Sequence, residues 1–188
     1  MNKRIIENRI DNFLGYGNLD SNIWFIGIEE RFHDEKNLQK RFEITNNKQV
    51  VDIHDMKDIK EHMKWFSSEE PPIQPTWNKL IRILLVLNSD EGIDRKRIKK
   101  FQKNDFARKD SNHCILDFMP LPCKSIKEWC YGKYGIDYLK TREIYSEKIM
   151  PKRIELFNSR LEEHSPKTVI FYSFTYLRRG IWQKIIKS

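Results

Sequence analysis

The fold class is decided by one segment of the sequence, which reads Asn22-Ile23-Trp24-Phe25-Ile26-Gly27-Ile28-Glu29-Glu30. Its apolar run from Ile23 to Ile26 is rich in β-branched and aromatic side chains, which is typical of a strand buried on both faces in a parallel sheet. We expect this strand to end at Gly27. Two carboxylates would then stand in the loop that follows it.

Two further segments have the character of buried strands. Residues 114–118 are the first of them, and the sequence Pro120-Leu121-Pro122 is expected to close this strand abruptly. Residues 168–172 follow Ser165-Pro166 and form the other candidate. We interpret Gly15-Tyr16-Gly17 as a tight turn.

Helical spacing of apolar residues occurs between and after these strands. It covers residues 59–66, 77–87, 144–163 with an interruption or a new start at Pro151, and 176–186. Strands that alternate with helices predict an α/β fold, a three-layer sandwich with a mainly parallel central sheet flanked by helices. The length of 188 residues fits a single domain over residues 1–188.

Composition limits the classes of function. No apolar run approaches the ~18 residues that a membrane span needs, so we expect a soluble, cytoplasmic protein without a membrane partner. The formal net charge of +8 favours a polyanionic partner, with DNA as the first candidate. A genome poor in G and C would also enrich Lys, so the net charge alone does not show that the protein binds DNA. The spacing of His and Cys matches no familiar metal site, and no motif predicts a cofactor.

Sites in parallel α/β sheets form beyond the carboxyl ends of the strands. The loop after the first strand offers Glu29, Glu30 and Arg31, and a carboxylate there could act as a general base on water. Asp117 ends the second apolar strand. The alternative interpretation is a solvated loop for the first and a helix cap or salt bridge for the second.

The strand followed by Gly27-Ile28-Glu29, together with the strand followed by Asp117-Phe118-Met119-Pro120-Leu121-Pro122, resembles the uracil-DNA glycosylase superfamily. In that superfamily the first loop carries the residue that positions or activates the attacking water, a place that Glu29 holds here. A polar residue at the end of a middle strand reads the base edge, and Asp117 matches it. Ser173-Phe174-Thr175 stands where the superfamily has a His-Pro-Ser loop.

The resemblance implies a set of site residues. Glu29 and Asp117 are the expected catalytic pair. The expected base-binding residues are Gly27, Ile28, Phe32, Phe118, Pro120 and Tyr176, and the expected DNA-binding residues are Arg31, Lys124, Lys127, Arg178 and Arg179. An ionised Asp117 accepts hydrogen bonds but donates none, which would suit a cytosine derivative better than uracil.

Three functions therefore stay open at this point. The first is a DNA glycosylase-like enzyme that flips a base, including a modified base of the kind found in phage DNA, and hydrolyses its N-glycosidic bond. The second is a catalytically silent nucleic-acid-binding module of the same fold. The third is a nuclease in which Glu29, Glu30 and Asp117 gather Mg²⁺.

Overall fold

The structure, a computed structural model, describes all residues except 90–91, 126, 173–179, 181 and 186–188. Five strands form one sheet in the order β3-β1-β4-β2-β5. They are β1 (Gly15–Gly17), β2 (Ile23–Arg31), β3 (Val50–Val51), β4 (His113–Cys123) and β5 (Thr168–Phe171). β2 pairs in parallel with both β4 and β5, β1 pairs in parallel with β3, and the β1–β4 pair is antiparallel. The predicted α/β fold with a mainly parallel sheet is confirmed.

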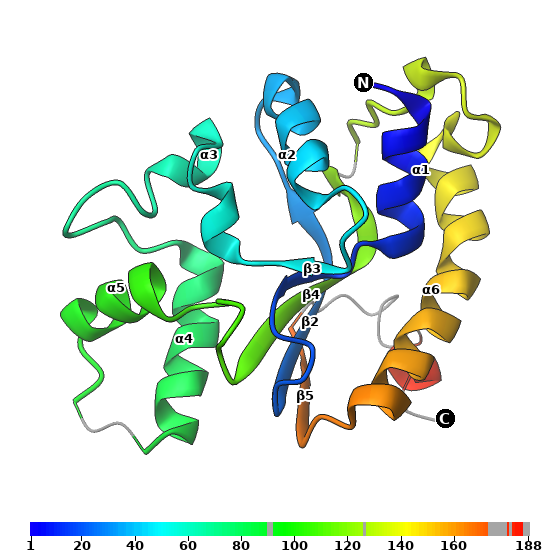
Figure 1. The fold of residues 1–188 in the computed structure, drawn as a ribbon. Coiled ribbons are helices and arrows are strands. Elements are labelled where there is room, and N and C mark those ends of the chain that lie inside the picture. The colour runs from blue at the N-terminus through cyan, green and yellow to red at the C-terminus, as the bar shows by residue number, and fades with distance from the viewer. Residues whose placement is uncertain (90–91, 126, 173–179, 181, 186–188) are drawn as a thin grey trace.

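Helices cover both faces of this sheet (Figure 1). The α-helices are α1 (Lys3–Asn12), α2 (Leu38–Thr45), α3 (Lys60–Met63), α4 (Pro75–Leu87), α5 (Arg95–Asn104) and α6 (Arg142–His164). In Figure 1, α3, α4 and α5 lie on one side of the sheet, and α1 and α6 lie on the other. No described helix has both the length and the apolar character that a membrane crossing requires.

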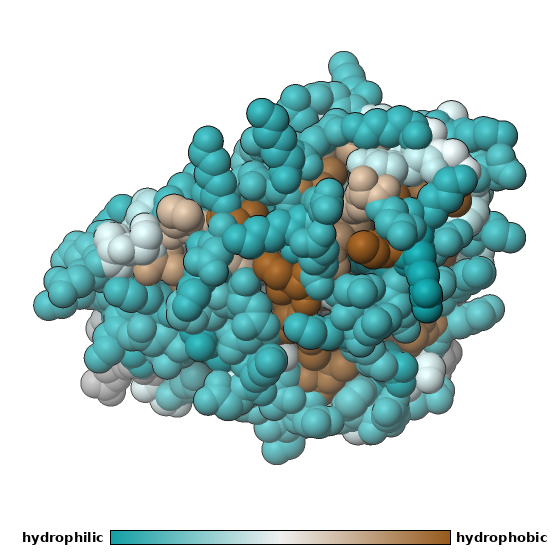
Figure 2. Space-filling model, turned by 45° about the horizontal axis from the view of Figure 1, so that its top comes forward, coloured by the Kyte–Doolittle hydropathy of each residue, from teal (hydrophilic) through white to brown (hydrophobic). Residues whose placement is uncertain are grey.

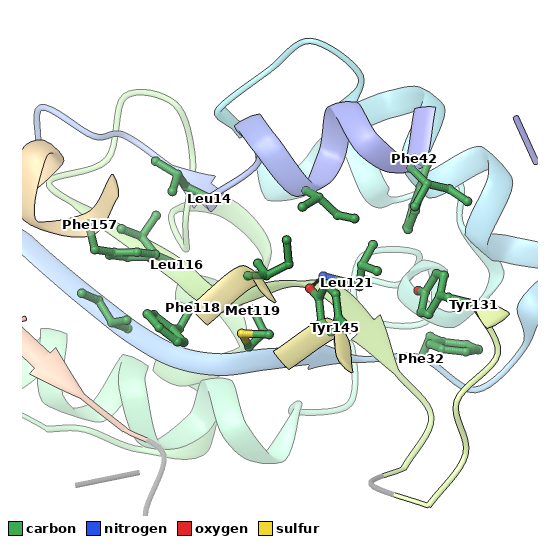
Figure 3. Close-up of a cluster of buried hydrophobic side chains, with 14 of the residues drawn as sticks. Leu14, Phe32, Phe42, Leu116, Phe118, Met119, Leu121, Tyr131, Tyr145 and Phe157 are labelled. Carbon is green, nitrogen blue, oxygen red and sulfur yellow. Dashed lines mark hydrogen bonds between the residues drawn. The ribbon is translucent and has the colours of Figure 1, made fainter. Parts of the chain in front are cut away.

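The side chains of β2 point alternately to the two faces of the sheet and contribute to two hydrophobic clusters. Trp24 and Ile26 belong to the cluster packed by α1 and α6, part of which Figure 3 shows, whereas Ile23 and Phe25 belong to the cluster packed by α4 and α5. Successive side chains of a strand point to opposite faces, so an apolar run without alternation fills both clusters at once. This is the physical reason why the segment predicts a central strand.

Both long strands continue past the residues at which the sequence predicts their ends. β2 runs through Gly27 to Arg31, and β4 runs through both prolines to Cys123. Proline is tolerated where a strand has no neighbour on one side. β1 pairs with β4 only up to Leu116, so the stretch with Pro120 is bordered by β2 alone. The expected end at Gly27 and the expected break at the prolines are therefore wrong.

The predicted turn at residues 15–17 is also wrong, because these residues form β1. Gly17 has φ of +106°, and a Cβ atom there would lie 2.7 Å from the carbonyl oxygen of His113 on β4. Glycine is thus required by the close approach of two strands rather than by a reversal of the chain.

The long helix predicted around Pro151 is continuous from Arg142 to His164. Proline removes one backbone hydrogen bond from a helix. Tyr145, Ile149, Arg153 and Phe157, at a spacing of four, are nevertheless all buried against the sheet on both sides of the proline. Tertiary packing therefore keeps α6 continuous through Pro151. The helix expected at 59–66 is short, α3 alone, and the one expected at 176–186 lies largely outside the described residues.

Candidate functional site

A cavity of about 690 Å³ lies over the face of the sheet that α4 covers. The end of β2 contributes Ile28, Glu29, Glu30 and Arg31, and β4 contributes Asp117. The opposite wall comes from α3 and the start of α4. Figure 2, in which the top of Figure 1 comes forward, shows apolar side chains recessed between projecting hydrophilic ones. The volume falls in the range of small-molecule sites, about 300–1,000 Å³.

Asp117 reaches the cavity because of its position in β4. Ile115, two residues earlier, faces the core under α4, and the side chain of Asp117 follows on the same face. No hydrogen bond or ion pair joins its carboxyl group to another residue of the described part of the chain. Burial, and then the negative charge of Glu30, raise the pKa of Asp117 to about 8, although Arg9 and Arg153 act against the shift. At neutral pH this carboxyl group is predominantly protonated.

This protonation predicts a pH dependence of stability. The unfolded chain loses the proton of Asp117 near 3.8, whereas the folded protein keeps it up to about 8. Between these values the folded state binds more protons, so the free energy of unfolding falls as the pH rises. An Asp117→Asn variant does not titrate there. In urea denaturation, its stability relative to wild type should increase from about pH 4 to about pH 8, by at most about 1.4 kcal/mol per pH unit, and then level off. A difference that stays constant over this window would contradict the assignment.

Glu30 lies at the centre of a buried ionic network at the floor of the cavity. Arg41 donates to its Oε1 in a short contact, Tyr16 donates to the same oxygen at 2.8 Å, and Arg9 donates to Oε2 at 3.3 Å. Burial by itself raises the pKa of Glu30, but Arg41, His62 and Arg9 outweigh it and hold that pKa far below its usual range. Glu30 is therefore anionic beside a protonated Asp117. Two carboxyl groups with pKa values pushed apart are typical of acid–base sites.

Glu29, on β2, also lines this cavity. Consecutive side chains in a regular strand point to opposite faces, but the β2–β4 register shifts between Glu29 and Arg31, and both Glu29 and Glu30 line the cavity. Arg142, the first residue of α6, donates from Nη2 to both carboxylate oxygens of Glu29 at 2.6 Å. The pair is mostly buried, with 14% of the Glu29 side chain exposed. The arginine thus fixes the orientation of the carboxylate.

Aromatic rings form much of the remaining wall. The rings of Trp65 and Trp77 lie 6.2 Å apart, and His62 is at the same distance from Trp77. All three line the cavity, as does Tyr172, which follows β5. Flat rings around a polar floor suit a planar heterocyclic ligand.

Tyr172 occupies the space that Gly27 leaves open. A Cβ atom on Gly27 would lie 2.5 Å from the Tyr172 hydroxyl oxygen and 2.6 Å from Cζ. We expect Gly27→Ala to destabilise the protein by about 1–3 kcal/mol through this overlap. In a Tyr172→Ala background the same change should cost much less, and chemical denaturation of the four proteins measures the coupling. An equal cost in both backgrounds would exclude this contact as the cause.

The structure brings part of the predicted site together. Glu29, Asp117, Ile28 and Arg31 line one cavity, and Gly27 is paired with Asp117 in the sheet. Lys124 and Lys127 are exposed after β4, and Lys124 pairs with Glu128. The predicted residues Tyr176, Arg178 and Arg179, and the loop at 173–175, lie outside the described residues.

Three predicted base-binding residues are buried away from the cavity. Phe118 packs against Phe157 of α6, and Phe32 lies in the same core cluster (Figure 3). Pro120 is buried in β4, and its carbonyl oxygen accepts a hydrogen bond from Arg9 Nε at 2.9 Å. The predicted stacking of a base on Phe32 or Phe118 is therefore wrong. It assumed loops directly after Gly27 and Asp117, where both strands continue.

Sequence analysis missed several residues of the site. Arg9, Tyr16 and Arg41, which donate to Glu30, come from α1, β1 and α2. The aromatic wall comes from α3, from Trp65 just after it and from α4. Tyr16 stands between two glycines, and this pattern could have indicated a strand residue of the site. The arginines gave no such indication, because the same helices also carry exposed cations, Lys3 and Arg4 in α1 and Lys40 in α2.

Glu29 and Glu30, two of the three acidic residues of the site, form ion pairs with arginines. Over the described ranges of the chain, no three His, Cys, Asp or Glu side chains are placed to hold one metal ion. Arg142 holds Glu29, and Arg41 and Arg9 hold Glu30. A cation would have to displace these guanidinium groups to bind there, so the arrangement does not favour the nuclease alternative.

Comparisons of the chain with protein-family models, curated proteins and solved structures found no match. What the cavity does is therefore argued from its residues.

Proposed function

We propose that this protein is a glycosylase-like enzyme that takes a base of DNA into the cavity and hydrolyses its N-glycosidic bond. The observation that supports this most strongly is that Glu29 and Asp117, from separate strands, line one cavity with aromatic walls. Extrusion of a base from a duplex costs roughly a few kcal/mol in lost stacking and pairing. Stacking against rings of the wall offsets part of that cost.

The two carboxyl groups have different roles in the proposed reaction. The water oxygen forms a bond to C1′ of the sugar while the bond from C1′ to the base nitrogen breaks. Glu29, an oriented acceptor, takes a proton from the water. Asp117, protonated at neutral pH, donates its proton to the departing base. Exchange with solvent restores both groups.

The raised pKa of Asp117 also changes the expected base. A protonated carboxyl group offers one donor and one acceptor, as an amide does, whereas an ionised one only accepts. The preference for cytosine derivatives depended on an ionised Asp117. In this environment Asp117 suits an edge with a carbonyl acceptor next to an N–H donor.

The test uses oligonucleotides that each carry one modified or deaminated base. The protein is incubated with them in the presence of a metal chelator, and alkali then exposes abasic sites as strand breaks. We expect breaks at one or more of these bases. Cleavage that occurs only with Mg²⁺ and without abasic sites would instead support a nuclease.

A silent binding module is the second candidate, and one observation favours it. The oxygens of Glu29 and Glu30 are already occupied by arginines, as in a network that only stabilises the fold. Salt-sensitive DNA binding without product from any oligonucleotide would support this alternative.

A further inference from the structure

The helix α5 carries an unusual concentration of positive charge. Its sequence RKRIKKFQKN contains six cations and no acidic residue. The cations are Arg95, Lys96, Arg97, Lys99, Lys100 and Lys103. Lys124, predicted to bind DNA, is different, because it pairs with Glu128.

This charge is placed where it opposes helix formation. Three of the cations, Arg95, Lys96 and Arg97, stand in the first turn, at the positive end of the helix dipole, where positive charge is unfavourable. Lys96 and Lys100 are like charges four residues apart, which destabilises a helix. A local arrangement that works against stability is expected where a residue serves function.

The fold holds α5 against the wall of the cavity. Its apolar side chains Ile98 and Phe101 are buried in the core. Gln102 accepts a hydrogen bond from the backbone N–H of Gln74 at 2.9 Å and donates to the carbonyl oxygen of Trp65 at 3.4 Å. Gln74 and Trp65 both line the cavity. The basic helix and this wall therefore form one packed unit.

The outer face of α5 remains open. Arg95, Lys96 and Lys100 are exposed, and no ion pair joins any of them to an acidic group within the described residues. Lys99 differs, since it pairs with Glu70 at 3.0 Å. We call Arg95, Lys96 and Lys100 the α5 basic surface.

We propose that the α5 basic surface binds the phosphate backbone of the nucleic acid whose base enters the cavity. This inference rests on the proposed function, and it names the surface that holds the substrate. Exposed cations without internal partners release counterions when they meet phosphates. An anionic membrane is the competing partner, because Ile83, Val86 and Leu87 of α4 are exposed apolar residues. The apolar face of α5 itself is buried, which favours nucleic acid, since a membrane-surface helix needs that face free.

The test compares two triple variants that each lose three positive charges. One is Arg95→Gln with Lys96→Gln and Lys100→Gln. The control is Arg4→Gln with Lys148→Gln and Lys152→Gln, which changes exposed cations of α1 and α6 on the other side of the sheet (Figure 1). Binding of a fluorescent DNA duplex is measured at several salt concentrations, and thermal unfolding shows that both variants are folded.

We expect the α5 variant to bind at least about 10-fold more weakly at about 0.1 M salt. The slope of log affinity against log salt should become shallower by up to about 2.7, because each lost phosphate contact removes about 0.9. The control should change little. Equal losses in both variants would overturn the proposal, since they would show a response to net charge alone.

Two further readouts separate the remaining outcomes. Unchanged DNA affinity of the α5 variant together with lost binding to phosphatidylserine vesicles would overturn the proposal in favour of a membrane. Base release is scored separately. DNA binding that depends on α5, without base release by the wild type, would contradict the proposed function and support the binding surface. Base release with unchanged affinity in the α5 variant would contradict the binding surface alone.

Discussion

Replacement of Glu29 by Gln is expected to lower the rate of base release by about 10²- to 10⁴-fold, the usual contribution of a positioned acid or base. Gln has the same shape and keeps an oxygen that can accept from Arg142, so the local structure should persist. What the variant loses is the ability to take a proton from water. DNA affinity should therefore remain nearly unchanged, because the loss concerns the reacting state.

The matched control for this experiment is Glu147→Gln, an exposed position on α6. It removes one carboxylate with the same chemistry away from the cavity. Rates of abasic-site formation at saturating protein are compared among the three proteins. Wild-type activity in the Glu29→Gln variant would remove Glu29 from the reaction.

The second large effect concerns stability. Glu30→Ala should lower the free energy of unfolding by about 3–5 kcal/mol, because it leaves Arg9 and Arg41 buried without a shared counter-charge. The two arginine side chains are 1% and 0% exposed, so they are almost wholly withdrawn from bulk solvent. Thr45 and Glu61 still accept from them, and the protein should remain folded.

A comparison with an exposed ion pair sets the scale of this loss. Glu70 pairs with Lys99 and has 72% of its side chain exposed, so Glu70→Ala should cost much less stability than Glu30→Ala. Urea denaturation at neutral pH measures both variants. Similar losses in the two would show that the network under the cavity contributes no more than a surface pair.

The sequence was sufficient to predict the central sheet but not the residues at which its strands end. The run from Ile23 to Ile26 predicted a central strand because such a run of β-branched and aromatic residues is typical of a strand buried on both faces. The ends of β2 and β4 could not be predicted, since they depend on which neighbour lies beside each residue. Pro120 ends a strand in most contexts, but here one side of β4 has no partner strand.

The site was predictable where it depends on position along a strand. Glu29 and Asp117 lie two register positions apart on neighbouring parallel strands, and both line the cavity. The state of Asp117 was not predictable, because its pKa depends on burial and on Glu30. The partners of Glu30 were not predictable either. Arg9 and Arg41 resemble surface cations in the sequence, and only the packing of α1 and α2 buries them.

The central claim is that one base is held between Glu29 and Asp117 in this cavity. A crystal structure of the Glu29→Gln variant with an oligonucleotide from which the wild type releases a base tests it most directly. The account predicts that this base is extruded into the cavity, with its edge at the Asp117 carboxyl group and its C1′ facing residue 29. A base bound elsewhere on the protein, or still stacked in the duplex over an empty cavity, would contradict it.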